Sequence, residues 1–239
     1  MTYCVALRLN AGLVFLSDSR TNAGVDQIGT FRKMTVFERP GERCMVLLTS
    51  GNLGITQSVR QIVMEPGDGP SVWSAHSMPD AAAAVGDAVR RVYDRDSEAL
   101  KKQGIEFACT LILGGQIRGD RCRLFQVYSA GNFIEAQDEN LYFQIGESKY
   151  GKPIIDRIVR PETSLRDGAK CALISMDSTI RSNLSVGPPL ELTVCPRDAL
   201  RAAVRRDIGS DDDYFRMIRS SWSEALRQAF RALPDPQLG

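Results

Sequence analysis

The sequence predicts an α+β protein with one domain, residues 1–239, built as an αββα sandwich in which helices cover both sides of two stacked sheets. Three observations lead to this expectation. Strand patterns come in groups separated by helical segments and do not alternate with them, which disfavours a Rossmann or TIM-barrel arrangement. The chain has 239 residues, a length that suits one large domain. Hydrophobic residues make up 43 % of it, as is usual for a globular protein.

The first half of the chain is rich in predicted strands. Apolar runs that flank turn residues indicate two hairpins, at 3–9 with 13–17 and at 33–38 with 43–50. Apolar residues at helical spacing then indicate two helices. The first starts after Gly51 and ends near residue 66, and the second runs from Asp80, which we expect to cap it, to near Gly104.

The second half repeats this order of strands and helices. Strands are expected at 107–116, 121–129, 133–136, 141–144, 189–195 and 199–206. Three helices are expected in this half. The first spans 148–159, the second starts at Ser164 with Asp167 in a capping box, and the third follows the acidic run 211–213. Residues 139–144 read ENLYFQ and resemble the recognition site of a potyviral protease. They are either an engineered site or a coincidence within a strand, and they carry no functional inference.

Charge and histidine content exclude several function classes. The chain has 30 Lys and Arg against 29 Asp and Glu, so no overall field attracts nucleic acid or an anionic membrane. Its single histidine, His76, excludes histidine-rich metal sites and disfavours a Ser–His–Asp triad. We expect His76 to be structural, in a loop before the second helix. If the protein is an enzyme, its general base is then a group other than imidazole.

Cysteines and hydropathy indicate the compartment. The six cysteines show no C-x-x-C pair and lie mostly in apolar runs, which is typical of reduced, buried thiols. No apolar run approaches the ~18 residues of a transmembrane helix. The segment MTYCVALRLN lacks the pattern of a signal peptide. We therefore expect a cytoplasmic location.

The second residue offers a base without histidine. Aminopeptidases remove an initiator Met before a small residue, so Thr2 is expected to become the first residue. It then carries a hydroxyl nucleophile and an α-amine with a pKa of about 7.7–8.0, which can accept the hydroxyl proton. Met-Thr alone is a commonplace start, and this hypothesis depends on the residues that follow.

Three further segments occur in a recognisable order. The run 12–20, GLVFLSDSR, is an apolar strand that ends in Asp18. Lys33 follows in the run FRKM, and LTSGN at 48–52 places Gly51 between an apolar strand and a helix. Together these segments resemble N-terminal-nucleophile hydrolases of the proteasome type over the first ~60 residues.

The resemblance gives each of these residues a role that physical chemistry supports. A cation at Lys33 lowers the pKa of the Thr2 α-amine and stabilises an alkoxide, while Asp18 keeps Lys33 charged and in place. The Gly51 N–H, at the start of a helix, serves as the oxyanion donor. Taken singly, Asp18 and Lys33 favour an ordinary exposed ion pair at strand ends, and only the joint pattern favours the catalytic roles.

Two downstream segments resemble the bacterial Anbu (ancestral β-subunit) family. They are 144–156, QIGESKYGKPIID, and 175–189, SMDSTIRSNLSVGPP. The resemblance implies that Ser148 is the serine near the terminal amine and that Asp177 is the later aspartate of the site. The usual Asp-x-x-Ser-Gly spacing is absent after Asp177, so Ser182, Asn183 and Ser185 remain alternative sources of the hydroxyl or polar group.

The family implies an N-terminal-nucleophile αββα fold, self-association into a homo-oligomer, threonine-peptidase chemistry on peptide or amide bonds, and no metal or organic cofactor. No motif names an unfoldase partner. Substrate-pocket residues are expected in 20–28, 27–32 and 50–54. Two alternatives stay open. One is an amidohydrolase that acts on a small amide, and the other is a non-catalytic assembly scaffold.

Overall fold

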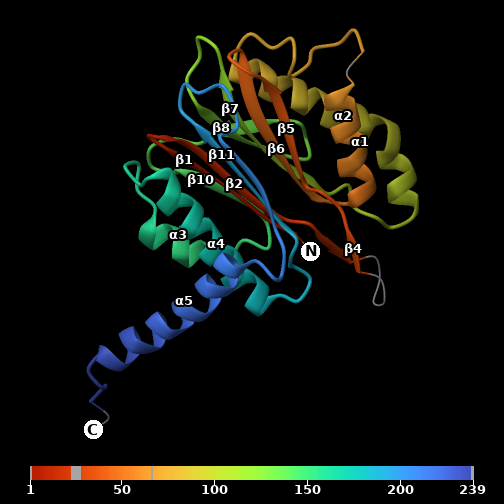
Figure 1. Cartoon of the computed structure of the whole chain (residues 1–239). Coiled ribbons are helices and arrows are strands. Elements are labelled where there is room, and N and C mark those ends of the chain that lie inside the picture. The colour runs from red at the N-terminus through yellow and green to blue at the C-terminus, as the bar shows by residue number, and fades with distance from the viewer. Residues whose placement is uncertain (1, 23–27, 66, 238–239) are drawn as a thin grey trace.

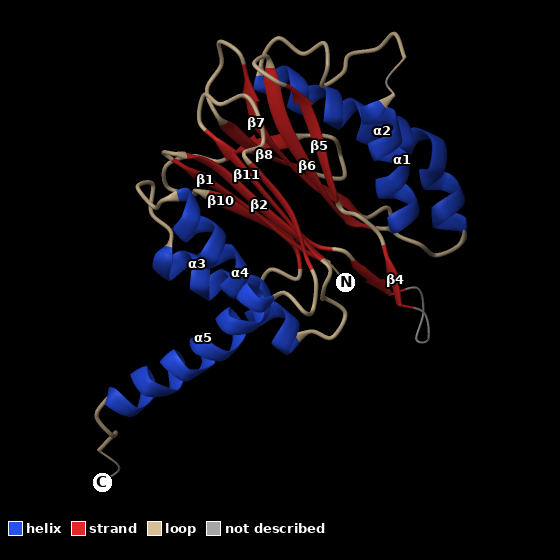
Figure 2. Cartoon of the chain, viewed as in Figure 1, coloured by secondary structure: helices blue, strands red, loops and turns tan. Residues whose placement is uncertain are grey.

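A computed structural model of the chain describes residues 2–22, 28–65 and 67–237. Within these residues, two antiparallel sheets lie face to face and helices cover the outer face of each (Figures 1 and 2). The layers follow the order helix, sheet, sheet, helix. This arrangement confirms the predicted αββα sandwich.

The first sheet contains the N-terminal strand between two neighbours. Its strand order is β10-β1-β2-β11-β12, and all neighbours are antiparallel. The strands are β1 (Tyr3–Leu9), β2 (Gly12–Asp18), β10 (Tyr142–Gly146), β11 (Leu190–Pro196) and β12 (Val204–Ile208). β1 and β2 form the first predicted hairpin, and every residue of β2 is buried. Thr2 therefore precedes a strand that is fixed on both sides.

The second sheet has the order β5-β6-β7-β8-β9 and is also antiparallel. Its strands are β5 (Met34–Arg39), β6 (Arg43–Gly51), β7 (Cys109–Ile117), β8 (Arg123–Val127) and β9 (Phe133–Glu135). The second predicted hairpin is confirmed as β5 and β6. A small extra sheet pairs β3 (Arg20–Asn22) with β4 (Ile28–Thr30). The sequence does not predict it because three-residue strands are too short to show a period.

The helices pack in two groups. α1 (Leu53–Met64) and α2 (Met78–Lys102) cover the second sheet, and α3 (Lys152–Ile158) and α4 (Leu165–Ser182) cover the first. Three clusters of buried side chains fill the spaces between the layers. One lies under α1 and α2, one lies under α3 and α4, and the third lies between the sheets. Burial of apolar surface on all three levels is the main force that holds the sandwich together.

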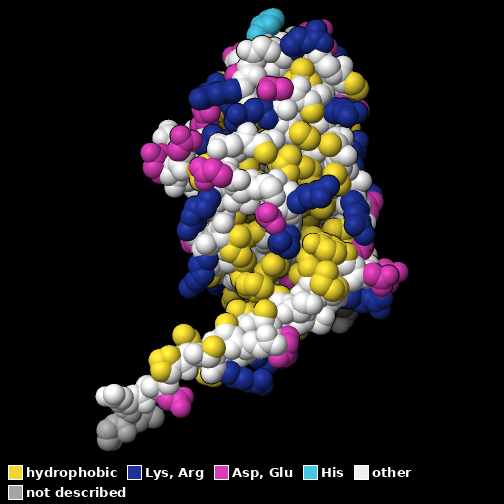
Figure 3. Space-filling model, turned by 60° about the vertical axis from the view of Figure 1, so that its left-hand side comes forward, with side chains coloured by type: hydrophobic (Ala, Val, Ile, Leu, Met, Phe, Trp, Pro, Cys, Tyr) yellow, Lys and Arg dark blue, Asp and Glu magenta, His cyan; other side chains and the backbone are white. Residues whose placement is uncertain are grey.

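The last helix, α5 (Asp213–Ala232), starts against α4 and then leaves the body of the molecule (Figure 1). Phe215 and Ile218 in its first half are buried. Further along the helix, Leu226 is 51 % exposed and Phe230 is 76 % exposed. Figure 3 shows hydrophobic side chains along this projecting helix. The apolar face of α5 is thus covered only near its start.

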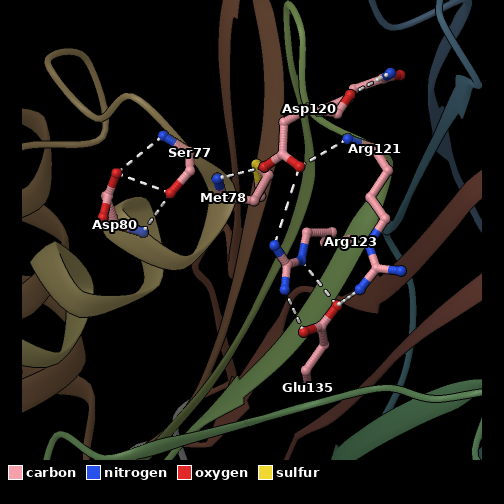
Figure 4. A network of polar contacts seen from close by, with 8 residues as sticks. Ser77, Met78, Asp80, Asp120, Arg121, Arg123 and Glu135 are labelled. Carbon is pink, nitrogen blue, oxygen red and sulfur yellow. Dashed lines mark hydrogen bonds and ion pairs between the residues drawn. The ribbon is translucent and has the colours of Figure 1, made fainter.

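The start of α2 differs from the prediction by one turn. Ser77 is the N-cap, and Asp80 closes a capping box by accepting a hydrogen bond from the Ser77 N–H at 3.1 Å (Figure 4). The Met78 N–H donates to Asp120 Oδ2 at 2.8 Å, so the helix is tied to the turn before β8. Figure 4 also shows Arg123, which lies between Asp120 and Glu135 and donates two hydrogen bonds to Glu135.

Two other boundaries are corrected. The helix expected at 148–159 begins at Lys152, because residues 148–151 form a turn in which the Ser148 carbonyl accepts from the Lys152 N–H. Proline is favoured in the first turn of a helix, where Pro153 now stands. The strand expected at 199–206 is Val204–Ile208. Asp198 and Leu200 have positive φ angles of 62° and 48°, so the chain turns there before the strand can begin.

The remaining expectations concern single features. All six cysteines are buried and free, as expected. His76 is exposed in the loop before α2. Three residues of the ENLYFQ segment form the start of β10, where Phe143 is buried, so this stretch is part of the first sheet. No helix among the described residues is long and apolar enough to cross a bilayer.

Candidate functional site

Thr2 is held by the end of β10. Its carbonyl oxygen accepts a hydrogen bond from the Glu147 N–H at 2.7 Å, and Tyr3 pairs with Gly146 in the first sheet. Gly146 has a φ of +83°, and a Cβ atom there would lie 1.9 Å from the Thr2 carbonyl oxygen. Only glycine allows this close approach. The position of Thr2 therefore depends on the sequence Gly146-Glu147.

Asp18 and Lys33 form a buried ion pair beside this segment. Asp18 ends β2, Lys33 immediately precedes β5, and their side chains are 0 % and 7 % exposed. Lys33 Nζ donates to Asp18 Oδ1 at 2.7 Å and to the Arg20 carbonyl oxygen at 2.6 Å. The same Asp18 oxygen accepts the Tyr3 N–H at 3.0 Å. A single Asp18 oxygen thus holds both Lys33 and Tyr3, the residue after Thr2.

Burial and charge act on Asp18 in opposite directions. Burial raises the pKa of the Asp18 carboxyl above its ordinary value, whereas the Lys33 ammonium and the N–H groups of Tyr3 and Gly187 lower it. Burial also raises the pKa of the Tyr3 hydroxyl, which is fully enclosed. That hydroxyl contacts Ser175 Oγ at 2.5 Å, so the N-terminal strand is anchored to α4 as well.

Thr2 and Lys33 line the same cavity, which is small, about 30 Å³. It opens between the start of β5, the end of β6 and one face of α1. Its lining residues are Thr2, Arg32, Lys33, Thr49, Leu53, Thr56, Gln57 and Arg60. The structure therefore brings Thr2, Lys33 and, through its ion pair, Asp18 together.

Gly51 lies at the junction of β6 and α1, as predicted. It is exposed and has a φ of +129°, and a Cβ atom there would lie 2.2 Å from the Ala108 carbonyl oxygen. The next residue, Asn52, caps α1 by accepting hydrogen bonds from the N–H groups of Gly54 and Ile55. Gly51 consequently sits at the positive end of a capped helix, where a backbone N–H can stabilise an anion.

Ser148 follows the segment that holds Thr2. It is half-buried, and its N–H donates to the Gly146 carbonyl oxygen at 3.0 Å. The neighbouring Glu147 is buried and accepts a hydrogen bond from Asn183 Nδ2 at 3.0 Å. Among the alternatives Ser182, Asn183 and Ser185, it is thus Asn183 that connects the end of α4 to this turn. Ser185 donates its N–H to Asn183 Oδ1 at 2.9 Å, and Ser182 is exposed.

The structure places Asp177 in a different environment from the one its predicted role requires. Its carboxylate is 1 % exposed and accepts hydrogen bonds from Arg181 Nε at 2.9 Å and Arg219 Nε at 2.8 Å. Arg219 belongs to α5 and Asp177 belongs to α4, so the hydrogen bond between them ties the two helices together. Within the described residues, no hydrogen bond or ion pair joins Asp177 to Thr2, Lys33 or Ser148. Two guanidinium groups occupy both carboxylate oxygens instead.

The pocket residues were predicted only in part. Arg32 and Leu53 come from predicted segments, whereas residues 23–27 lie outside the described residues. Thr56, Gln57 and Arg60 were missed. They extend the face of α1 that starts at Leu53, with spacings of three and four residues. The sequence does not show which side of α1 points to the sheet edge, so it does not predict this face as part of the site.

The described residues contain no group of three or more His, Cys, Asp or Glu side chains that could hold a metal ion. The site consists of a hydroxyl-bearing residue, a buried ammonium group, a buried carboxylate and backbone N–H groups at turns and helix starts. These groups suit nucleophilic attack on a carbonyl and stabilisation of the resulting negative charge.

Fold and site together define an αββα sandwich of the N-terminal-nucleophile hydrolase type. Solved structures agree closely with this class. Anbu (ancestral β-subunit) from Yersinia bercovieri is 50 % identical, with a TM-score of 0.93 and all of both chains covered. A structure described as a helical assembly of the Anbu complex from Pseudomonas aeruginosa is 47 % identical, with a TM-score of 0.94 and 99 % of both chains covered.

An Anbu (Gly-1) mutant from Hyphomicrobium sp. strain MC1 is also 47 % identical, with a TM-score of 0.93 and both chains covered completely. No protein-family model and no curated protein matches the chain. Identity near one half over the whole length shows common descent. The chain belongs to the Anbu family, as the segments 144–156 and 175–189 predict.

Proposed function

We propose that the chain is a proteasome-type threonine peptidase subunit that hydrolyses peptide or amide bonds with Thr2 after removal of Met1. The observation that carries this proposal is the position of Lys33. Its ammonium group is buried, is held by Asp18 at 2.7 Å, and faces the cavity that Thr2 also lines. A buried ion pair adds little net stability, because desolvation offsets the attraction, and buried ionisable groups beside a cavity are common at functional sites. We therefore expect Lys33 to serve a function beyond stability.

The proposed reaction uses the chain's own groups at each step. The Thr2 α-amine accepts the hydroxyl proton while Oγ attacks the carbonyl carbon, and the Gly51 N–H stabilises the oxyanion. The amine then delivers that proton to the leaving amine as the carbon–nitrogen bond breaks, and an ester remains on Thr2. Water attacks the ester with the same amine as base, which releases the acid and restores Thr2.

Two further residues support the reaction in this proposal. Lys33 keeps the α-amine neutral by charge repulsion and stabilises the developing alkoxide. Ser148, in the turn that begins at the Thr2-binding segment, is proposed as a proton relay near the amine. Asp177 is left out of the proposed machinery because Arg181 and Arg219 hold its carboxylate.

We further propose that the chain associates with copies of itself. The relative from Pseudomonas aeruginosa forms a helical assembly according to its description. In this chain, the second half of α5 and its C-cap residue present Leu226, Phe230 and Leu233 with exposures of 51 %, 76 % and 68 %. An amphipathic helix that leaves its apolar face uncovered needs a partner surface. A Phe230→Glu variant is then expected to sediment as a smaller species than the wild type, whereas an unchanged size would exclude this face.

Turnover and mass measurements test the peptidase proposal. The intact mass is expected to show loss of Met1, because only then does Thr2 carry a free α-amine. A Thr2→Ala variant should lose at least ~1000-fold in turnover of a peptide amide, and Thr2→Ser should retain part of the activity. Turnover of small amides without turnover of peptides would support the amidohydrolase alternative. Full activity in Thr2→Ala would remove Thr2 as the nucleophile, and no turnover at all would favour a scaffold.

A further inference from the structure

A second and larger cavity adjoins the one that Thr2 lines. It has a volume of about 410 Å³ and opens between β5, α1 and the edge formed by β11 and β12. Arg32 and Arg60 line both cavities, so these two side chains lie at the boundary between them.

The charge of Arg32 is already balanced. Its Nη1 donates to Glu191 at 2.7 Å, and its Nη2 donates to Asp207 at 2.6 Å. The Glu191 side chain is 8 % exposed and needs such a partner, because an unpaired buried carboxylate is costly. Arg32 is therefore occupied by the protein itself and has little capacity for a ligand.

Arg60 differs from Arg32 in this respect. Its Nη1 donates to the Arg32 carbonyl oxygen at 3.3 Å. Among the residues that the structure describes, no carboxylate lies within 4.0 Å of its guanidinium group. The side chain is half-buried. A guanidinium group has five N–H donors, so most of those of Arg60 remain available to a ligand in the cavity.

The sequence of α1 directs Arg60 toward Thr2. Four residues of α1 lie on one face of the helix, because they are three, one and three positions apart: Leu53, Thr56, Gln57 and Arg60. All of them line the cavity that contains Thr2. Leu53 lies nearest to the helix start beside Gly51, and Arg60 lies two turns further on. An extended side chain bound at Thr2 can thus run along this face and end at the guanidinium group.

We propose that this site takes amide substrates whose acyl part carries a carboxylate, such as a glutamyl or aspartyl residue, and that Arg60 binds that carboxylate. The proposal rests on the proposed role of Thr2 as the nucleophile. Arg60 is a specificity-determining residue in this account. In the adjoining cavity, Glu191 and Asp207 are paired with Arg32, and Arg205 and Arg206 also line the space, so its charges favour an anionic group.

Binding to an inactive protein tests the proposal independently of catalysis. In a Thr2→Ala background, fluorescent peptide amides that differ only in Glu, Gln or Leu at the acyl residue are compared by anisotropy. The Glu peptide should bind about tenfold or more tightly than the Gln peptide, because a hydrogen-bonded charge contributes that much. Arg60→Gln should abolish this difference, and Arg60→Lys should retain part of it.

Arg91→Gln is the matched control, because Arg91 is an exposed arginine on α2 and lies in neither cavity. It should leave the preference for Glu unchanged. Equal binding of the Glu and Gln peptides, no binding of either, or a preference that survives Arg60→Gln would each overturn the proposal.

A second arm separates this proposal from the one about Thr2. Wild-type protein is treated with two peptide epoxyketones that carry Glu or Gln beside the reactive ketone. Faster modification of Thr2 by the Glu reagent supports both proposals. Modification of Thr2 at equal rates overturns the role of Arg60 alone. If neither reagent modifies Thr2 although the binding arm shows the Glu preference, the nucleophile proposal fails and the carboxylate site stands.

Discussion

The backbone N–H of Tyr3 donates a hydrogen bond at 3.0 Å to Asp18 Oδ1, the oxygen that also accepts Lys33 Nζ at 2.7 Å. One buried carboxylate oxygen thus positions the residue after Thr2 and the cation of Lys33, which lines the same cavity as Thr2. Any change at Asp18 is expected to affect both. This coupling distinguishes the pair from an ordinary ion pair at two strand ends.

The first prediction concerns this ion pair. Asp18→Asn leaves Lys33 buried without a counter-charge and should lower the free energy of unfolding by about 3–5 kcal/mol. The double variant Asp18→Asn with Lys33→Met removes both charges and should regain part of that stability. Denaturant unfolding measures the stability, and covalent labelling of Thr2 measures reactivity. Labelling should be at least ~100-fold slower in the single and the double variant. Normal labelling in a stable double variant would show that Lys33 is not needed.

The second prediction concerns the glycine that faces the Thr2 carbonyl. Gly146→Ala should destabilise the protein and slow the reaction of Thr2, because its Cβ atom would lie 1.9 Å from that oxygen. Gly119→Ala is a matched control with a similar φ of +86° but no atom within 4 Å of the added Cβ. The control should lose only about 1 kcal/mol of stability and keep full reactivity. Equal effects of the two substitutions would mean that the close contact with Thr2 has no functional consequence.

The third prediction concerns the anchoring of α5 by Asp177. Arg219→Gln removes the contact between α5 and Asp177 but leaves Arg181 to balance the carboxylate. Hydrogen exchange in the first half of α5 should become about tenfold faster, while labelling of Thr2 stays at the wild-type rate. Arg227→Gln, which alters an exposed pair with Glu224, should leave exchange unchanged. Loss of Thr2 labelling in Arg219→Gln would instead connect Asp177 to the reaction.

The fourth prediction concerns pH. Burial raises the pKa of the Cys122 thiol from 9.0 to about 11. Between these values the thiol ionises in the unfolded chain and stays protonated in the folded one, so its contribution to stability is complete below pH 9 and is lost as the pH rises to 11. The melting temperature of Cys122→Ala should therefore fall less than that of the wild type between pH 8.5 and about 11 under reducing conditions. Parallel curves would contradict the raised pKa.

The sequence predicts the layers of the fold well for a physical reason. β1, β2 and β6 are long and apolar, and α2 and α4 carry clear helical spacing, so burial alone specifies them. Elements whose position depends on backbone conformation are predicted less well. β12 starts after two residues with positive φ, Asp198 and Leu200, and a leucine does not signal that conformation.

The candidate site shows the same division. Thr2, Asp18 and Lys33 lie at the ends of predicted strands, and the structure places Thr2 and Lys33 at one cavity with Asp18 paired to Lys33. Asp177 lies on a helix that also contacts α5, so its partner depends on tertiary packing. Arg60 became recognisable only when the structure oriented α1 against the sheet edge.

Covalent labelling tests the central claim most directly. Purified wild-type protein is incubated with a peptide epoxyketone, digested, and analysed by mass spectrometry to locate the modified residue. The account predicts one adduct per chain, on Thr2 as the first residue, with no adduct in Thr2→Ala. Retention of Met1, or an adduct of equal yield in Thr2→Ala, would contradict the assignment of Thr2 as the nucleophile.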